Sequence, residues 1–361
     1  MSLKDRILKA STIKESAVLA KSKLFAEKDI ISIEDSALMN IALSGDIDGG
    51  MTPGILQIAA ESMHFKSKFA LAVAKSFTNK FPDGAILFYD SEYGTPDSYF
   101  NDFSTENVIH TPVLDLEQFK IDIMAQLKSI ELGDKLLIIV DSMGNIPSLK
   151  EVEDTDAGKT VGDMSRAKQM KSVFRMIMPR INQKEVYVVI INHTYKTQEM
   201  YSKDVPNGGT GSVYNSNIIW TITKAQEKGV KKSASETFSE IEEDDKGKGK
   251  IKKEKKKASP EEVIGYQFTI NIFKSRFVIQ GSKIPILVTF EGGIQKWAGM
   301  LDLAMEAEYI LKPDGGISYV RKDKPEEKYR RKDIENNNEF WESFINETDF
   351  NDWVKKKFRY K

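Results

Sequence analysis

A lysine and a serine stand side by side within ILQIAAESMHFKSKFALAVA, residues 55–74, in the setting of a phosphate-binding loop. In such a loop, backbone N–H groups and a helix N-terminus surround phosphates, the lysine reaches the terminal phosphates, and the hydroxyl binds Mg²⁺. The pattern G-x-x-x-x-G-K-[ST] is incomplete here, because Ala60 and Phe65 stand at its two glycine positions. Glycine matters there because it tolerates positive φ and close backbone approach, so the pattern alone does not establish a nucleotide site. The candidate phosphate-binding residues are Ala60, Glu61, Ser62, Met63, His64, Phe65, Lys66 and Ser67.

Two carboxylates at the ends of other apolar runs strengthen this interpretation. KLLIIVDSMGN, residues 135–145, ends its apolar run in Asp141, the arrangement in which a carboxylate holds Mg²⁺ together with the loop hydroxyl. AILFYDSEYG, residues 85–94, carries Glu92 just after its run, where a glutamate beside phosphates can orient and deprotonate water. Each carboxylate alone is also what an ordinary strand end or exposed loop contains. The order of lysine–serine, glutamate and aspartate together favours ATP hydrolysis with Mg²⁺.

The elements that must position these residues alternate along the chain. Apolar runs lie at 55–60, 85–89, 136–140, 186–191 and 218–222, and segments with helical spacing lie at 66–81, 116–130 and 165–181. Apolar runs that do not alternate with polar residues indicate strands covered on both faces. We therefore predict an α/β fold with a mostly parallel central sheet flanked by helices, continued by strands at 266–273 and 284–290. Ligands of such sheets bind at the carboxyl ends of the strands, where the candidate residues fall.

The flanking segments suggest three parts. Residues 1–35 form a predicted N-terminal arm, helical from about residue 3 to 30, whose apolar stripe must pack on its own core or on a neighbouring subunit. Of the two, packing on its own core is the commoner case. Residues 36–296 form the core, interrupted at 225–262 by a charged insertion that we expect to be solvated and mobile. Residues 297–361 form a small C-terminal domain rich in aromatic and basic residues.

Composition excludes several classes of protein. Lys and Arg number 53 against 54 Asp and Glu, so any nucleic-acid binding must come from local clusters of charge. The chain has no cysteine, which excludes disulfides and thiolate metal sites and fits a reducing compartment. The N-terminus lacks the apolar core of a signal peptide, and no apolar stretch is long enough to span a bilayer. We expect a soluble intracellular protein that has no membrane partner.

Several longer phrases of the sequence carry more information than these short motifs. They are NIALSGDIDGGMTPG (40–54), LFYDSEYG (87–94), VIHTP (108–112), VDSMGN (140–145), DMSRAKQMKSVFR (163–175), INHTYKTQEMYSK (191–203), GGTG (208–211), GYQF (265–268) and KSR (274–276). In this order they resemble the RecA family of recombinases, more closely its branch from T-even bacteriophages. The resemblance runs from near the N-terminus to about residue 350, apart from the charged insertion. Phenylalanine before the loop lysine is in keeping with that branch, whereas Ala60 departs from it and bears on nucleotide affinity and turnover.

The resemblance implies a RecA-type P-loop ATPase that forms a helical filament on single-stranded DNA and pairs it with homologous double-stranded DNA. It implies roles in DNA recombination, repair and replication, encoded by a phage and carried out in the cytoplasm of its bacterial host. It also implies two protein partners, a single-stranded DNA-binding protein and a loading mediator. ATP would be hydrolysed to ADP and phosphate, or to AMP.

The resemblance also implies roles for individual residues. Lys66 would contact phosphates, Ser67 and Asp141 would coordinate Mg²⁺, and Glu92 would activate water. Tyr99 would stack on adenine, and His193 would sense the γ-phosphate and signal to the following DNA loop. Lys274 and Arg276 would reach ATP bound on the adjacent subunit. The alternatives are a core tyrosine, a histidine that only bonds its surroundings, and a solvated basic strand edge.

Two long loops are the expected DNA-binding segments, at 146–165 and 194–210. Cations in such loops neutralise phosphates and apolar side chains stack on bases, with no reading of base identity. The alternative for each is a plain surface loop. The candidate DNA-binding residues are Arg166, Lys168, Arg175, Lys196, Lys203, Gly208 and Gly209, and the basic segments YVRK (319–322) and KYRRK (328–332) are candidates for guiding duplex DNA.

Three other functions stay open at this point. One is a RecA-fold mediator that joins filaments with weak ATPase activity, for which Ala60 is the main support. The second is a hexameric helicase-type motor on the same fold. The third is a DNA-coating protein that binds without regard to nucleotide.

Overall fold

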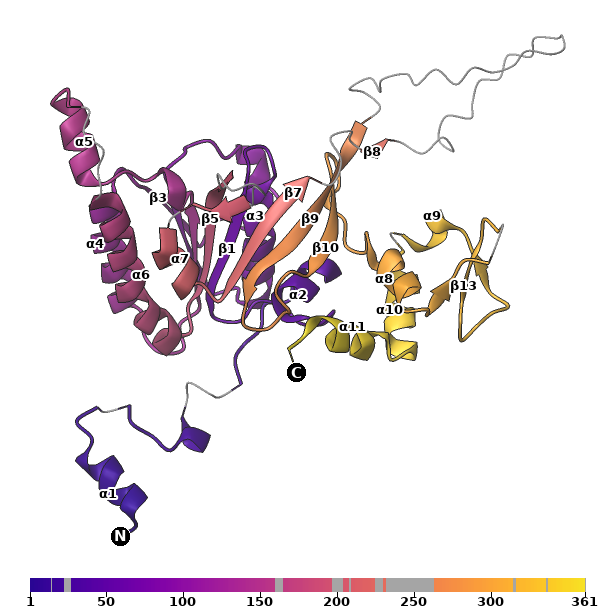
Figure 1. Ribbon diagram of the computed structural model, residues 1–361, viewed down its shortest axis with the longest axis horizontal. Coiled ribbons are helices and arrows are strands. Elements are labelled where there is room, and N and C mark those ends of the chain that lie inside the picture. Colours follow the sequence, from indigo (N-terminus) through magenta and orange to yellow (C-terminus); the bar gives the residue numbers. More distant parts are fainter. Residues whose placement is uncertain are drawn as a thin grey trace.

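The computed structural model describes a large α/β core, a small C-terminal region and an N-terminal arm (Figure 1). The described residues are 1–13, 15–22, 27–159, 165–196, 204–207, 209–224, 230–231, 263–313, 316–335 and 337–360. Within them, no helix is both long and apolar enough to cross a membrane.

One large sheet organises the core. Its strands follow the order β11-β10-β9-β7-β1-β5-β4-β2-β3, and every neighbouring pair from β7 to β3 is parallel. The strands β9, β10 and β11 continue the sheet in antiparallel fashion. The bounds are β1 Gly54–Ala60, β2 Ala85–Asp90, β3 Val108–Pro112, β4 Leu136–Asp141, β5 Tyr187–Lys196, β7 Ile218–Lys224, β9 Val263–Ser275, β10 Lys283–Thr289 and β11 Gly293–Ile294. The predicted α/β class with a mostly parallel sheet is confirmed.

Helices cover both faces of this sheet. Successive side chains of a strand point to opposite faces, so a continuously apolar strand must be buried on both. Leu56 and Ile58 of β1 pack with the helices α2 (Ala37–Ser44) and α3 (Lys66–Lys80). Ile55 of the same strand packs on the other side with α4 (Leu116–Ser129) and α6 (Ser165–Lys184). The continuous apolar runs of the sequence therefore reflect strands that are buried on both sides.

The C-terminal region has its own small sheet and aromatic core. Three short strands, β12 Ile310–Leu311, β13 Tyr319–Arg321 and β14 Lys328–Tyr329, pair antiparallel. The helices are α8 Met300–Glu306, α9 Arg331–Ile334, α10 Asn338–Glu347 and α11 Phe350–Phe358. Asp46 of the core accepts a hydrogen bond from Arg359 at 2.8 Å and lies 3.7 Å from Lys355, which ties the end of α11 to the core. The predicted division at residues 35 and 297 stays a prediction.

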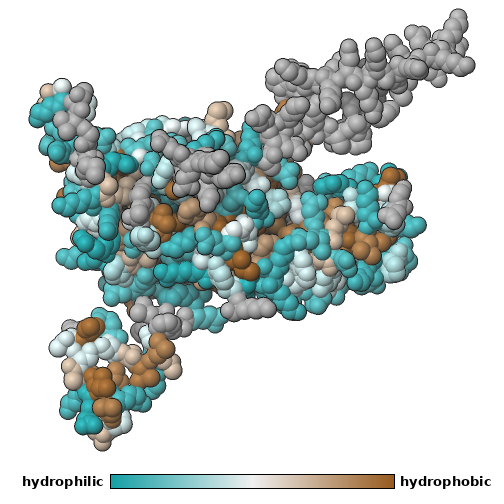
Figure 2. Space-filling view, in the orientation of Figure 1, coloured by the Kyte–Doolittle hydropathy of each residue, from teal (hydrophilic) through white to brown (hydrophobic). Residues whose placement is uncertain are grey.

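The N-terminal arm differs from its prediction. The helix α1 covers only Leu3–Ala10, and a single 3-10 turn follows at Leu19–Lys21, whereas helix was predicted to about residue 30. The hydroxyl of Ser11 bonds the backbone N–H and the carbonyl of Ile13, which competes with continued helix. None of the residues of α1 is buried, so the expected packing on its own core is wrong for this helix, whereas Ile31 and Ile33 at the end of the arm are buried in the core. Figure 2 shows apolar side chains on the arm, which stands apart from the rest of the molecule.

The two segments predicted as DNA loops are partly regular structure. The first contains the helix α5 (Leu149–Asp156), which Ser148 and Glu151 cap reciprocally. The second begins inside β5, which continues to Lys196 and pairs with β6 (Asp204–Pro206), and it ends in α7 (Gly209–Asn215). Most of the charged insertion at 225–262 lies outside the described residues, apart from β8 (Val230–Lys231), which pairs with β9.

Candidate nucleotide site

The loop between β1 and α3 follows the path of a phosphate-binding loop without its glycines. Ala60 ends β1 fully buried, and Phe65 immediately precedes α3 with φ 54° and ψ 27°. This is the left-handed region, which costs a residue with a side chain about 1–2 kcal/mol. The Phe65 ring packs edge-on against Phe268 of β9, with ring centroids 5.7 Å apart. That contact offsets part of the cost and explains how phenylalanine stands where the pattern has glycine. Met63 also has a left-handed backbone, with φ 60°.

Lys66 is folded back into this loop. Its Nζ donates to the carbonyl oxygens of Glu61 at 2.9 Å and Ala60 at 3.3 Å, and it lies 3.5 Å from Nδ1 of His193. Burial lowers the pKa of the Lys66 ammonium, against the opposing effect of the Glu92 and Asp141 carboxylates. A desolvated ammonium held by carbonyl oxygens and a ring nitrogen, with no carboxylate bonded to it, is well placed to exchange these partners for the charged oxygens of a phosphate.

Ser67 and Asp141 meet at the carboxyl end of the sheet. Ser67 Oγ donates to Asp141 Oδ2 at 2.7 Å, and Thr95 Oγ1 lies 3.5 Å from the same oxygen. Asp141 is only 4% exposed, and burial raises its pKa to about 6. Hydroxyl and carboxylate oxygens are ligands that Mg²⁺ prefers, so the pair fits this ion. The described residues hold no cluster of three His, Cys, Asp or Glu, so phosphate and water would supply its remaining ligands.

Glu92 is fixed by side chains that follow two other strands. Its Oε1 accepts from Ser142 Oγ and from Asn145 Nδ2, both at 2.7 Å, and lies 3.2 Å from Nε2 of His193. Since His193 also contacts Lys66, the structure places five of the predicted residues together in two hydrogen-bonded sets, Lys66–His193–Glu92 and Ser67–Asp141, which the chain joins between Lys66 and Ser67. Asn145 and Thr95 also contact this group, and the sequence analysis did not identify them.

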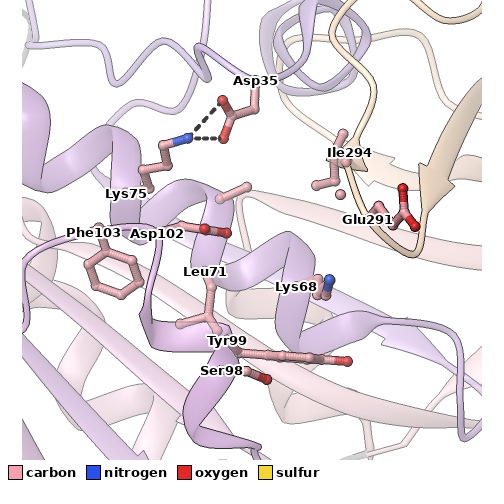
Figure 3. A pocket seen from close by; sticks show the side chains of 13 residues that line it. Asp35, Lys68, Leu71, Lys75, Ser98, Tyr99, Asp102, Phe103, Glu291 and Ile294 are labelled. Carbon is pink, nitrogen blue, oxygen red and sulfur yellow. Dashed lines mark hydrogen bonds and ion pairs between the residues drawn. The ribbon is translucent and has the colours of Figure 1, made fainter.

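Tyr99 lines a cavity of about 260 Å³ beside α3 (Figure 3). The ring belongs to the 3-10 turn Asp97–Phe100, its burial raises the pKa of its hydroxyl, and Lys68 Nζ lies 4.8 Å from the ring centroid. An ion pair between Lys75 and Asp35 stands on another side of the cavity. The turn at residues 291–294 also lines it and was missed in the sequence. Its signal is Glu-Gly-Gly directly after an apolar run, the pattern of a tight turn.

Lys274 and Arg276 are not part of this group. Lys274 lies opposite Ile219 of β7, whereas Ile222 lies opposite Ala60 at the loop, so Lys274 is displaced toward the amino ends of the parallel strands. Its Nζ donates to the carbonyl oxygens of Val213 at 2.7 Å and Tyr214 at 2.9 Å. Burial and the neighbouring Arg276 lower the pKa of Lys274. A contact with nucleotide on another subunit stays a prediction.

The candidate DNA-binding residues have different surroundings. The Arg166 guanidinium donates to the carbonyl oxygens of Gly144 at 2.5 Å and Ile146 at 3.0 Å, so it secures the chain after β4. Lys168 and Arg175 are exposed on α6. Lys196 ends β5 and lies 3.6 Å from Glu61 Oε1. Gly209 begins α7, and Lys203 and Gly208 lie outside the described residues.

Comparisons with known proteins give two matches. Residues 297–354 match the family model described as Bacteriophage T4, Recombination and repair protein, C-terminal domain. The chain is also similar to the recombination and repair protein of Enterobacteria phage T4. The two are 40% identical over 368 residues, which cover 99% of this chain and 86% of the relative.

Proposed function

The chain belongs to the family of the phage T4 recombination and repair protein, and on that premise we propose that it is an ATP-dependent homologous recombinase. It forms a helical filament on single-stranded DNA and catalyses pairing and strand exchange with a homologous duplex. The observation that supports this best is the proximity of two hydrogen-bonded sets, Lys66–His193–Glu92 and Ser67–Asp141, at the carboxyl end of the parallel strands. A DNA-coating protein that ignores nucleotide has no use for such a group.

The residues divide the work of hydrolysis among themselves. The loop N–H groups, the N-terminus of α3 and Lys66 bind the phosphates. Ser67 and Asp141 would hold Mg²⁺, which would supply positive charge beside the phosphates. Glu92 orients the attacking water and accepts its proton, since its carboxylate is already held by neutral donors. The cavity beside Tyr99 takes the adenine, which stacks on the Tyr99 ring.

Glu92 also connects the nucleotide to both DNA segments. Asn145, which bonds Glu92, precedes the first segment, and His193 lies on the strand that leads into the second. A phosphate that draws Lys66 and His193 toward itself changes what Glu92 contacts, and the change reaches both segments. ATP then acts as a switch on DNA affinity, with Lys274 and Arg276 completing the site from the neighbouring subunit.

The test measures ATP hydrolysis by the purified chain with and without single-stranded DNA, for the wild type, Lys66→Ala and Lys80→Ala. Lys80 is the matched control, since it ends the same helix and donates to the carbonyl of Ile30, far from the loop. We expect DNA to raise turnover, Lys66→Ala to lower it by roughly 100-fold or more, and Lys80→Ala to leave it unchanged.

Other outcomes point to other functions. Absence of turnover with intact DNA binding favours the mediator, for which Ala60 in place of glycine is the supporting feature. DNA affinity that is indifferent to ATP favours a coating protein. Closed rings instead of filaments in electron micrographs favour a helicase-type motor.

A further inference from the structure

The turn that carries Glu92 is held through Ser91, which bonds the backbone of Asp141 and Ser142, and through one buried oxygen of Asp90. Asp90, the last residue of β2, accepts at Oδ1 from the backbone N–H of Glu92 at 2.9 Å and of Tyr93 at 2.8 Å. Tyr93 has φ 52°, a left-handed conformation that a side chain rarely adopts unless its surroundings impose it. Asp90 is 5% exposed, so water does not readily replace its carboxylate in holding this turn.

The second oxygen of Asp90 is engaged from the edge of the sheet. Nε2 of His110 lies 3.3 Å from Asp90 Oδ2, and the His110 ring stacks on Phe88 with ring centroids 5.8 Å apart and an angle of 26° between the planes. His110 belongs to β3, the last strand in the sheet order, and its side chain is 54% exposed. The backbone of Val113, just after β3, also donates to the Asp90 carbonyl at 2.9 Å. The edge strand therefore contacts both the side chain and the backbone of Asp90.

We propose that Asp90 is a positioning residue for Glu92 and that His110 holds Asp90 in place from the sheet edge. The Glu92 side chain contacts Ser142, Asn145 and His193, and the last two lie beside or on segments that respond to nucleotide or DNA in the proposed function. The bonds from the backbone N–H groups of Glu92 and Tyr93 to Asp90 hold the turn independently of those two side chains. This inference rests on the proposed function, because it assigns Glu92 its place in ATP hydrolysis.

The arrangement separates binding of nucleotide from its hydrolysis. Lys66 and Ser67, which meet the phosphates in the proposed function, begin α3 after the loop that follows β1, and within the described residues their side chains bond Ala60, Glu61, His193 and Asp141, not Asp90. Displacing the turn after β2 moves Glu92 but breaks none of the bonds that Lys66 makes to the loop carbonyls or that Ser67 makes to Asp141. Loss of the Asp90 acceptor therefore lowers kcat while the KM for ATP changes little.

The experiment compares Asp90→Ala with Asp90→Asn in the full chain, measuring DNA-stimulated ATP hydrolysis over a range of ATP concentrations. Asparagine keeps an oxygen that accepts from both N–H groups, and it replaces the charged second oxygen, which faces His110, with an NH2 group. We expect Asp90→Ala to lower kcat by roughly 10- to 100-fold, the size expected for a misplaced catalytic group, with an almost unchanged KM. Asp90→Asn should recover most of the wild-type kcat.

A second pair of variants addresses His110 and does not depend on a buried substitution. His110→Phe keeps a ring to stack on Phe88 but loses the contact with Asp90, whereas His110→Gln keeps a donor for Oδ2. We expect a few-fold loss of kcat for His110→Phe and little loss for His110→Gln, since a single side-chain hydrogen bond separates them. If Asp90→Ala does not fold, judged by its thermal unfolding, this pair and Asp90→Asn carry the test.

The results separate the inference from the function on which it rests. A wild-type chain without DNA-stimulated ATPase activity removes the proposed function itself. An active wild type whose kcat is unchanged by Asp90→Ala and His110→Phe overturns the positioning role alone. The positioning role is also overturned if Asp90→Asn lowers kcat as much as a folded Asp90→Ala does. The charge of Asp90, and not its oxygen as a hydrogen-bond acceptor, would then matter.

Discussion

The nucleotide end of the sheet and the C-terminal region treat buried charge in opposite ways. At the nucleotide end, burial shifts the pKa of Lys66 downward and that of Asp141 to about 6. Met63, Phe65 and Tyr93, three of the five non-glycine residues described with positive φ, also lie there. In the C-terminal region the buried cation Arg321 forms ion pairs with Asp323 at 2.5 Å and Glu347 at 2.8 Å, which neutralise its charge.

The difference shows which buried charged side chains are paired within the chain and which can still bind a ligand. Arg321 belongs to the basic segment YVRK, which the sequence analysis considered for guiding duplex DNA. Its side chain is 3% exposed and shared between two carboxylates, so Arg321 itself stabilises the fold of this region. Buried charges at the nucleotide end have weaker partners within the chain, which leaves them free to bind a ligand at some expense of stability.

The largest expected effect is on the C-terminal core. Trp341 is fully buried, stacks on Trp297 and donates from Nε1 to the Ile334 carbonyl at 2.8 Å. We expect Trp341→Ala to lower the free energy of unfolding by about 3–5 kcal/mol, measured by urea denaturation. Lys66→Met, which removes a desolvated charge at nearly constant volume, should leave stability unchanged or raise it.

Trp353→Ala is the control for the first prediction, because Trp353 stacks on Phe350 at the partly exposed surface and should cost less than Trp341→Ala. The comparison between the two regions breaks down if Lys66→Met destabilises the chain as much as Trp341→Ala does.

A smaller effect should follow pH. The pKa of Asp141 is about 6 in the folded chain against an ordinary 3.8, so ionising this carboxyl destabilises the fold. The destabilisation is absent below pH 4 and fully present above pH 6. The stability of the wild type relative to Asp141→Asn should therefore fall as pH rises from 4 to 7, by up to about 3 kcal/mol. Urea unfolding of both proteins without Mg²⁺ at several pH values measures this difference.

Asp83→Asn, at an exposed position after α3, is the matched control for the pH series and should follow the wild type. Parallel stability curves for wild type and Asp141→Asn would show that the buried carboxylate is as well satisfied as the charges of the C-terminal region.

The smallest expected effect concerns backbone strain. Met63 is 89% exposed and left-handed, so Met63→Gly relieves strain and loses almost no packing. Glycine also gains entropy in the unfolded chain, so the net change should stay within about 1 kcal/mol of zero. Ser62→Gly, without a left-handed backbone to relieve, should be less stable than Met63→Gly by about 1 kcal/mol. Equal melting temperatures for the two variants would show that the loop stores no strain at Met63.

Most of the core was predictable because its strands are buried on both sides. The runs at 55–60, 85–89 and 136–140 became β1, β2 and β4 with at most one residue added at either end. The edge strand β3 was not predicted, because His110 and Thr111 interrupt its apolar pattern where one side faces solvent. The helix α5 was not predicted, because it buries no residue and lacks the stripe of buried apolar side chains that indicates a helix.

The part of the site that lies at the ends of the parallel strands was predictable from the sequence. Parallel strands present their carboxyl ends at one edge, so the proximity of Ser67, Glu92 and Asp141 followed from the order of the runs. The contacts of Asn145, Thr95 and the turn at 291–294 depend on loop geometry, which has no periodic signature. The same holds for His110, whose approach to Asp90 depends on the register of β3 beside β2.

The pairing of β7 with β9 has a consequence for protein engineering. The two strands are hydrogen-bonded antiparallel neighbours, with Lys224 opposite Phe268, so the chain leaves and re-enters the sheet at nearly the same place. Lengthening the connection between such neighbours costs little, because the entropy of closing a loop grows only with the logarithm of its length. A reporter domain or an affinity tag spliced into residues 225–262 would have both of its ends anchored by one existing strand pair, and the parallel strands that carry the nucleotide site would keep their register.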